Sequence, residues 1–248
     1  MREYPKPTVQ LPGAFQCTSE AKLPPAGIPS PAEMRDVVTG AIEHLGPRLT
    51  STRFTISPTI AVGTTRFVLT VSAVDSNEAF AVKVTTKDLI AHPSIAQINV
   101  PPTFRNEWVT RHLAMEQEIP YSGQRHVTVA PLVKGDTLFA HATQRGLSER
   151  EWDIGYETVP TVMRAIWREA RCPHDPNLGT LLDHHLDNII VGVIQPPFQA
   201  PSGDETPRFV FVDRRDDGLY HTETTLNEAI EDFRTIFKRH ALVRSAWG

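Results

Sequence analysis

Residues 180–191 read TLLDHHLDNIIV, a polar run that passes directly into the apolar triplet Ile189–Val191. β-Branched side chains pack well on a pleated surface, so the triplet predicts a short buried strand. The polar residues before it then form the loop that enters the strand. Loops held by a buried scaffold commonly carry functional residues. Residues 180–188 are therefore the candidate functional loop.

Two side chains of this loop have a spacing with chemical meaning. Asp183 and Asn188 lie five positions apart (188 − 183). A carboxylate can accept the proton of a hydroxyl group, and a carboxamide oxygen can bind Mg²⁺. An Asp followed at this distance by an Asn is an arrangement used in phosphoryl transfer. The pair predicts a catalytic role for Asp183 and a metal-ligand role for Asn188.

The composition limits the compartment and the partners. A chain of 248 residues suits one domain or two small lobes, and a net charge of −4 favours neither a nucleic acid nor an anionic membrane as partner. No apolar run of membrane-spanning length and no signal peptide is present. Cys17 and Cys172 predict free thiols, with one disulfide as the alternative. We expect a cytoplasmic protein, although delivery into another cell by a secretion system would fit the same composition.

The N-terminal segment is rich in proline. Residues 1–31 contain seven of the 21 prolines, which disfavour both helices and central strands. This predicts an extended arm that either docks, on the domain or on a partner, or remains disordered. Ser30, Pro31 and Glu33 then form a helix-start pattern, with Ser30 as the N-cap, and the helix should end near Gly46.

Three β-rich runs follow, at residues 54–57, 66–71 and 79–84, and predict an antiparallel meander. Lys83 lies on the third run. Gly63 is the one glycine of the first turn and is followed by Thr64 and Thr65, whose hydroxyl groups can donate hydrogen bonds.

The remaining elements follow from periodicity and from helix-start signals. Residues 103–115 predict an amphipathic helix carrying Glu107, and residues 126–138 predict a strand, an extended segment and a turn. Ser148 and Glu151 form a second capping box, in a helical stretch that Pro160 should break near Val159.

Two elements complete the chain. Residues 208–213 predict a buried strand that ends on the carboxylate of Asp213. Residues 226–237 predict a helix with one apolar face, made of Leu226, Ile230, Phe233 and Phe237.

In this order the elements resemble the protein kinase-like superfamily. The form is that of a minimal, atypical kinase similar to aminoglycoside phosphotransferases and small lipopolysaccharide-type kinases. The resemblance covers roughly residues 50–240 and rests mainly on Asp183, Asn188 and Asp213. It implies an α+β bilobal fold. Its parts would be a proline-rich arm at 1–31, an antiparallel-sheet N-lobe with a leading helix at 32–130, and a truncated, mostly helical C-lobe at 131–248.

The resemblance also implies a function, namely ATP- and Mg²⁺-dependent transfer of a phosphoryl group to a protein or small-molecule hydroxyl. Asp183 would be the catalytic base, and Asn188 and Asp213 would bind Mg²⁺. Lys83, which follows Phe80-Ala81-Val82, would bind phosphate. The other implied nucleotide contacts are Gly63, Thr64, Glu107 as the partner of Lys83, and the linker residues Pro131 and Val133. Pro131 has no N–H, so Val133 is the expected donor to adenine.

Several departures from the family pattern keep alternatives open. Leu181 stands where these families have a histidine, and Arg214 and Arg215 follow Asp213 in place of Phe-Gly. Only 35 residues follow Asp213 (248 − 213), too few for an ordinary peptide-binding lobe. One alternative is a pseudokinase that acts as a regulatory module, and another is transfer of AMP. A third is a metal-dependent phosphohydrolase, which would use His174, Asp175, His184, His185 and Asp187.

Overall fold

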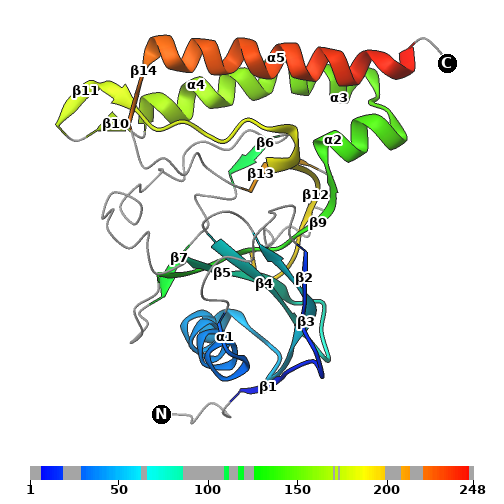
Figure 1. The fold of residues 1–248 in the computed structure, drawn as a ribbon, viewed down its shortest axis with the longest axis vertical. Coiled ribbons are helices and arrows are strands. Elements are labelled where there is room, and N and C mark those ends of the chain that lie inside the picture. The colour runs from blue at the N-terminus through cyan, green and yellow to red at the C-terminus, as the bar shows by residue number, and fades with distance from the viewer. Residues whose placement is uncertain are drawn as a thin grey trace. The chain divides into compact units, whose positions relative to one another are not determined.

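The computed structural model of the chain describes residues 7–18, 29–62, 66–85, 109–111, 117–119, 126–169, 171–172, 174–198, 208–212 and 220–245. The fold combines helices with several antiparallel strand pairs (Figure 1). This confirms the predicted α+β class, and the kinase-like arrangement stays a prediction. In the described part of the chain, no helix is both long and apolar enough to cross a membrane.

The chain forms two compact units that alternate along the sequence. The first consists of Met1–Ala96, Met115–Leu132 and Ile194–Asp204. The second consists of Gln97–Ala114, Val133–Val193 and Glu205–Gly248.

A sheet of seven strands forms the first unit, in the order β1-β3-β4-β5-β8-β7, with β2 also paired to β3. β3, β4 and β5 form the predicted antiparallel meander, and β8 and β7 extend it in antiparallel fashion. The strands are β1 (Thr8–Gln10), β2 (Gln16–Thr18), β3 (Arg53–Val62), β4 (Arg66–Ala73), β5 (Ala79–Thr85), β7 (Gln117–Ile119) and β8 (Val127–Pro131).

α1 (Pro31–Leu45) packs its apolar stripe on one face of this sheet (Figure 1). The helix begins as predicted, because Ser30 Oγ accepts a hydrogen bond from Glu33 N at 3.2 Å and Pro31 takes the first helical position. It ends at Leu45, next to the predicted Gly46, which is its C-cap and begins the short 3₁₀ turn η1 (Gly46–Arg48). The buried residues of the stripe are Met34, Val37, Val38, Ala41, Ile42 and Leu45.

The described part of the proline-rich arm lies on the edge of β3. β1 and β2 both pair with β3 in parallel, with Val9 opposite Phe54 and Cys17 opposite Ile60. Proline lacks an N–H group and is tolerated at edge strands, which suits Pro12 between these two short strands. The arm therefore docks on its own domain over this segment. Docking of a partner by the arm stays a prediction.

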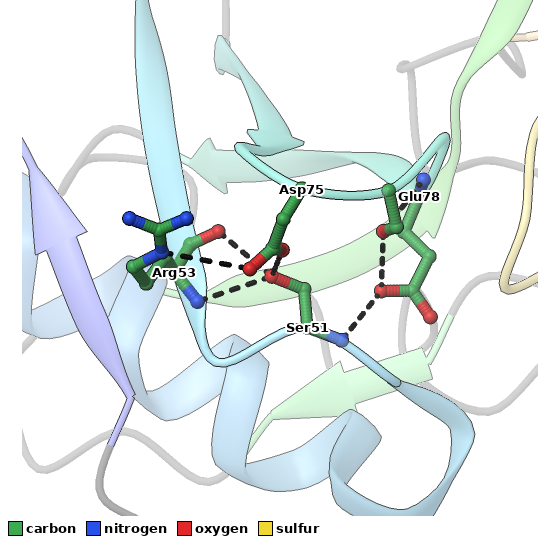
Figure 2. A network of polar contacts seen from close by, with 5 residues as sticks. Ser51, Arg53, Asp75 and Glu78 are labelled. Atoms are coloured by element: carbon green, nitrogen blue, oxygen red, sulfur yellow. Dashed lines mark hydrogen bonds and ion pairs between the residues drawn. The ribbon is translucent and has the colours of Figure 1, made fainter.

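A buried carboxylate joins the segment before β3 to the turn between β4 and β5 (Figure 2). Glu78 is 6% exposed and accepts hydrogen bonds from Thr50 N at 2.6 Å and Ser51 N at 3.0 Å. The hydroxyls of Thr50 and Ser76 also donate to it, each at 3.0 Å. Burial alone would raise the pKa of Glu78, but these backbone and hydroxyl donors outweigh burial and lower it.

Glu78→Gln is expected to lower the free energy of unfolding at neutral pH by about 1–3 kcal/mol, because an amide N–H₂ replaces an acceptor among four donors. The pKa of Glu78 is lowered from 4.5, so its stabilisation is complete above that pH and is lost as the pH falls through the folded-state pKa. The difference between wild type and variant should therefore shrink in acid. Urea unfolding followed by circular dichroism, from about pH 7 to about pH 3, measures it.

Asp75→Asn is the matched control for this prediction. Asp75 belongs to the same network, where Ser51 Oγ donates to it and Arg53 Nε lies 3.5 Å away (Figure 2). Its side chain, however, is 44% exposed. A smaller loss of stability is expected there. Equal losses of stability in the two variants would show that the burial of Glu78 and its four hydrogen-bond donors give it no larger contribution than Asp75.

The main sheet of the second unit has the order β6-β13-β12-β9. β12 (Ile189–Ile194) and β13 (Arg208–Phe211) are antiparallel, with Ile190 opposite Val210, which confirms both predicted buried strands. β6 (Val109–Arg111) runs parallel to β13, and β9 (Val133–Thr137) follows the inter-unit boundary at Leu132. A second, small sheet consists of β10 (Arg171–Cys172), β11 (Asp175–Gly179) and β14 (His221–Thr222).

The helix predicted over residues 103–115 is wrong at residues 109–111, which form β6. Val109 lies opposite Phe209, a partner 100 residues further along the chain (209 − 109). Val and Thr favour strands, and a distant strand partner overrides the local helical spacing of apolar residues. Glu107, in the same predicted helix, lies outside the described residues.

β9 and β12 approach each other closely at two glycines. A Cβ atom on Gly135 would lie 2.2 Å from Val191 O, and one on Gly192 would lie 2.5 Å from Lys134 O. Real Cβ atoms do not come this close to backbone oxygens, so the glycines permit this approach of the two strands.

The helices of the second unit enclose its apolar core. The predicted capping box is confirmed, because Ser148 Oγ accepts from Glu151 N and Glu151 accepts from Ser148 N. The predicted apolar face of the last helix is also confirmed as fully or almost fully buried. The helical elements are α2 (Leu138–Ala140), the π-helix η5 (His141–Arg145), α3 (Glu149–Asp153), the π-helix η6 (Ile154–Thr158), α4 (Val159–Glu169), the 3₁₀ turn η7 (Leu186–Asn188) and α5 (Glu223–Ser245).

The predicted break at Pro160 is confirmed as a change of helix type. η6 ends at Thr158, and Pro160 is the second residue of α4. Proline has no N–H to donate to the carbonyl four residues earlier, that of Tyr156. This carbonyl instead accepts a hydrogen bond from Arg234 Nε of α5 at 3.5 Å.

Candidate active-site loop

Leucines anchor the candidate loop at both ends. Leu181, Leu182 and Leu186 are buried in the core that α4 and α5 share. Leu181, at the histidine position of the family pattern, therefore acts as an ordinary core residue, and the loop gains an apolar anchor there. Between the leucines, Asp183 and His185 reach toward solvent, with side chains 26% and 68% exposed.

The backbone two residues further on orients the Asp183 carboxylate. His185 N donates to Asp183 Oδ1 at 3.3 Å, a local bond of the Asx-turn kind. His185 Nε2 lies 4.0 Å from the same oxygen. The carboxylate is thus held in place and remains partly exposed, as a group must be to accept a proton from a bound hydroxyl.

Asn188 lies where the loop enters β12. The turn η7 is closed by a hydrogen bond of 2.8 Å from Asn188 N to His185 O. The main-chain oxygen of Asn188 accepts a hydrogen bond of 3.0 Å from Val212 N, one residue after the end of β13. β12 and β13 are antiparallel, with Ile189 opposite Phe211. The first residue of β12 and the last residue of β13 are therefore neighbours, at the same end of the two strands. Asp213 follows Val212 in the sequence and itself lies outside the described residues.

The chemistry of the loop fits Mg²⁺. Asn188 offers a carboxamide oxygen, and Mg²⁺ prefers hard oxygen donors of this kind. The neighbouring polar side chains have other partners. Asp187 Oδ1 accepts from Thr137 Oγ1 at 3.2 Å, and His184 Nε2 lies 3.1 Å from Asp232 Oδ2. The phosphohydrolase alternative would need His184 and Asp187 on one metal, whereas here they tie the loop to β9 and to α5.

Lys83 is buried in the centre of the first unit's sheet. It is 6% exposed and lies in register between Val68 of β4 and Thr128 of β8. Alternation along β5 places it on the face opposite to Val82 and Val84, which belong to the core beneath α1. A buried ammonium group requires polar or anionic partners, so Lys83 differs from an ordinary solvated strand lysine.

The linker residues lie at the change from β8 to β9. Pro131 is the last residue of β8, opposite Phe80, and Val133 is the buried first residue of β9. Between them, Leu132 O accepts a bond of 2.9 Å from Gln195 N. The remaining predicted site residues, Gly63, Thr64, Glu107 and Asp213, lie outside the described residues.

Two residues around the loop were not predicted from the sequence, namely Thr137 and Asp232. Thr137 caps α2 and also donates to Asp187, 50 residues away. Asp232 is 48 residues from His184. Neither residue belongs to a local sequence motif. The one feature that could have drawn attention to Asp232 is its place directly before the apolar residue Phe233 on an amphipathic helix.

A scan against models of known protein families finds no match for this chain. A search of the curated proteins finds no significant match either.

Proposed function

We propose that the protein is an ATP- and Mg²⁺-dependent phosphotransferase that transfers the γ-phosphoryl group to a hydroxyl of a protein or small molecule. The hydrogen bond from Val212 N to Asn188 O is the observation that carries the proposal. It joins the main chain of Asn188, the residue before β12, to that of Val212, the residue that follows β13 and precedes Asp213. The Asp183 loop and the Asp213 strand are thereby neighbours in one unit, as two-point binding of Mg²⁺ and transfer from its complex would require.

Each residue has a role in the proposed reaction. Asp183 accepts the proton of the acceptor hydroxyl as its oxygen bonds to the γ-phosphorus and the bond to the bridging oxygen breaks, releasing ADP. Asn188 and Asp213 would hold Mg²⁺, which neutralises phosphate charge when bound. Lys83, paired with Glu107, would bind phosphate together with Gly63 and Thr64. Val133 donates to adenine, next to Pro131. Positioning and charge neutralisation supply most of the acceleration.

The test is incubation of the purified chain with Mg²⁺ and ATP labelled at either the α or the γ phosphate, alone and with a cell lysate. Transfer of γ label but not α label to an acceptor is the expected result. Transfer of α label would replace the proposal with AMP transfer. No transfer of either label, together with a rise in melting temperature on adding Mg-ATP, would make the protein a nucleotide-binding module without phosphotransferase activity.

A further inference from the structure

Within the loop, the side chain of His184 points toward α5 of the same unit. It lies between Asp183 and His185, and its side chain is 12% exposed, against 68% for that of His185. Its Nε2 lies 3.1 Å from Asp232 Oδ2 on α5. The middle residue of the Asp183–His185 backbone is thus tied to a helix 48 residues away in sequence.

The second ring nitrogen of His184, Nδ1, shows that packing alone does not explain a histidine at this position. His184 Nδ1 is buried and has no hydrogen-bond partner. A carboxylate can only accept, so Nε2 carries the proton shared with Asp232, and Nδ1 is left as a buried polar atom without a partner. Buried polar atoms are normally satisfied, and an exception calls for an explanation.

The orientation of the Asp183 side chain depends on the backbone of residues 183–185. Its Oδ1 accepts the N–H of His185, so the carboxylate turns with residues 183–185. α5 is fixed independently by Ile230 and Phe233, both fully buried and on either side of Asp232 in sequence. The contact between His184 and Asp232 therefore restrains the backbone that positions the Asp183 carboxylate.

We propose that His184 and Asp232 are positioning residues that hold Asp183 in the orientation needed to accept the acceptor's proton. The inference rests on the proposed function and adds a role for a pair that touches neither nucleotide nor acceptor. Asp232 is 58% exposed, and ion pairs in water contribute little to stability. The pair should therefore affect turnover more than folding.

The test compares His184→Leu, His184→Gln and Asp232→Ala with the control Glu228→Ala, which removes another exposed acidic residue of α5. Leucine fills the space without the tie, whereas glutamine keeps an N–H donor near the position of Nε2. His184→Leu and Asp232→Ala should lower kcat about 10- to 100-fold, with an unchanged KM for ATP and no fall in melting temperature. His184→Gln should recover most of the loss, and Glu228→Ala should resemble wild type.

The possible failures are distinguishable. If wild type transfers label and His184→Leu and Asp232→Ala keep its kcat, the positioning role is overturned and the proposed function stands. If His184→Gln is as impaired as His184→Leu, the contact through Nε2 is not responsible and the role is also overturned. If wild type transfers no label, the proposed function fails. Hydrogen exchange of the His185 and Asn188 amides then tests whether the contact between His184 and Asp232 restrains the loop. Faster exchange in Asp232→Ala than in Glu228→Ala supports it, and equal exchange overturns it.

Discussion

Asp183→Asn is expected to lower kcat for ATP-dependent transfer by about 10²- to 10⁴-fold, because an amide cannot accept the proton that the carboxylate takes from the hydroxyl. The variant should fold normally. Asparagine keeps the oxygen that accepts the N–H of His185, the bond that orients the side chain at 3.3 Å. KM for ATP should change little, because Asp183 acts on the acceptor. Steady-state rates with γ-labelled ATP, together with the melting temperature, measure both expectations.

Asp187→Asn is the matched control, since it makes the same isosteric change four positions along the same loop (187 − 183). Its side chain is bonded to Thr137 Oγ1 at 3.2 Å, and the amide oxygen can still accept that bond. Activity close to wild type is expected. An Asp183→Asn variant as active as Asp187→Asn would remove Asp183 from the chemistry.

Gly135→Ala is expected to cost about 3 kcal/mol of unfolding free energy, the largest stability effect we foresee. The added Cβ would lie 2.2 Å from Val191 O and 2.6 Å from Gly192 Cα. Both are backbone atoms of β12, so the clash cannot be relieved by turning a side chain. β9 would have to move away from β12, the strand that follows Asn188. Denaturant unfolding of the full chain measures the loss.

Gly40→Ala provides the control with the opposite sign. Gly40 lies inside α1, and its nearest neighbour for an added Cβ is Ile119 Cγ2 at 4.0 Å, an ordinary contact. Alanine should stabilise the helix by about 0.5–1 kcal/mol. If both substitutions changed stability equally, the close approach of β9 and β12 would not be the reason for a glycine at position 135.

Local sequence signals were sufficient where a few adjacent residues determine the structure. Ser30 and Ser148 each have a Glu three positions later, and both helices begin at the next residue. The apolar runs around Ile190 and Val210 predicted both strands of the antiparallel pair. Capping and strand propensity act within a single turn or run, so the sequence alone contains this information.

Features that depend on distant partners were not accessible in this way. Val109 pairs with a strand 100 residues away (209 − 109), and the spacing of its own neighbours indicated a helix. The burial of Lys83 depends on what covers the second face of β5, which alternation cannot reveal. No residue near His184 in the sequence indicates Asp232, which lies 48 residues away, and only the packing of α5 identifies it as the partner. In each case tertiary context decides.

The alternation of the two units along the chain has a practical consequence for fragments. Ile194–Asp204 returns to the first unit after most of the second has been traversed. There Pro196 O accepts the N–H of Ala79 at 2.8 Å, and Phe198 packs against the core beneath α1. A truncation after Leu132 would leave the N–H of Ala79 without this acceptor and remove an apolar edge from the core. Neither unit can be excised as one continuous piece, so the shortest fragment suited to binding or turnover studies must contain both.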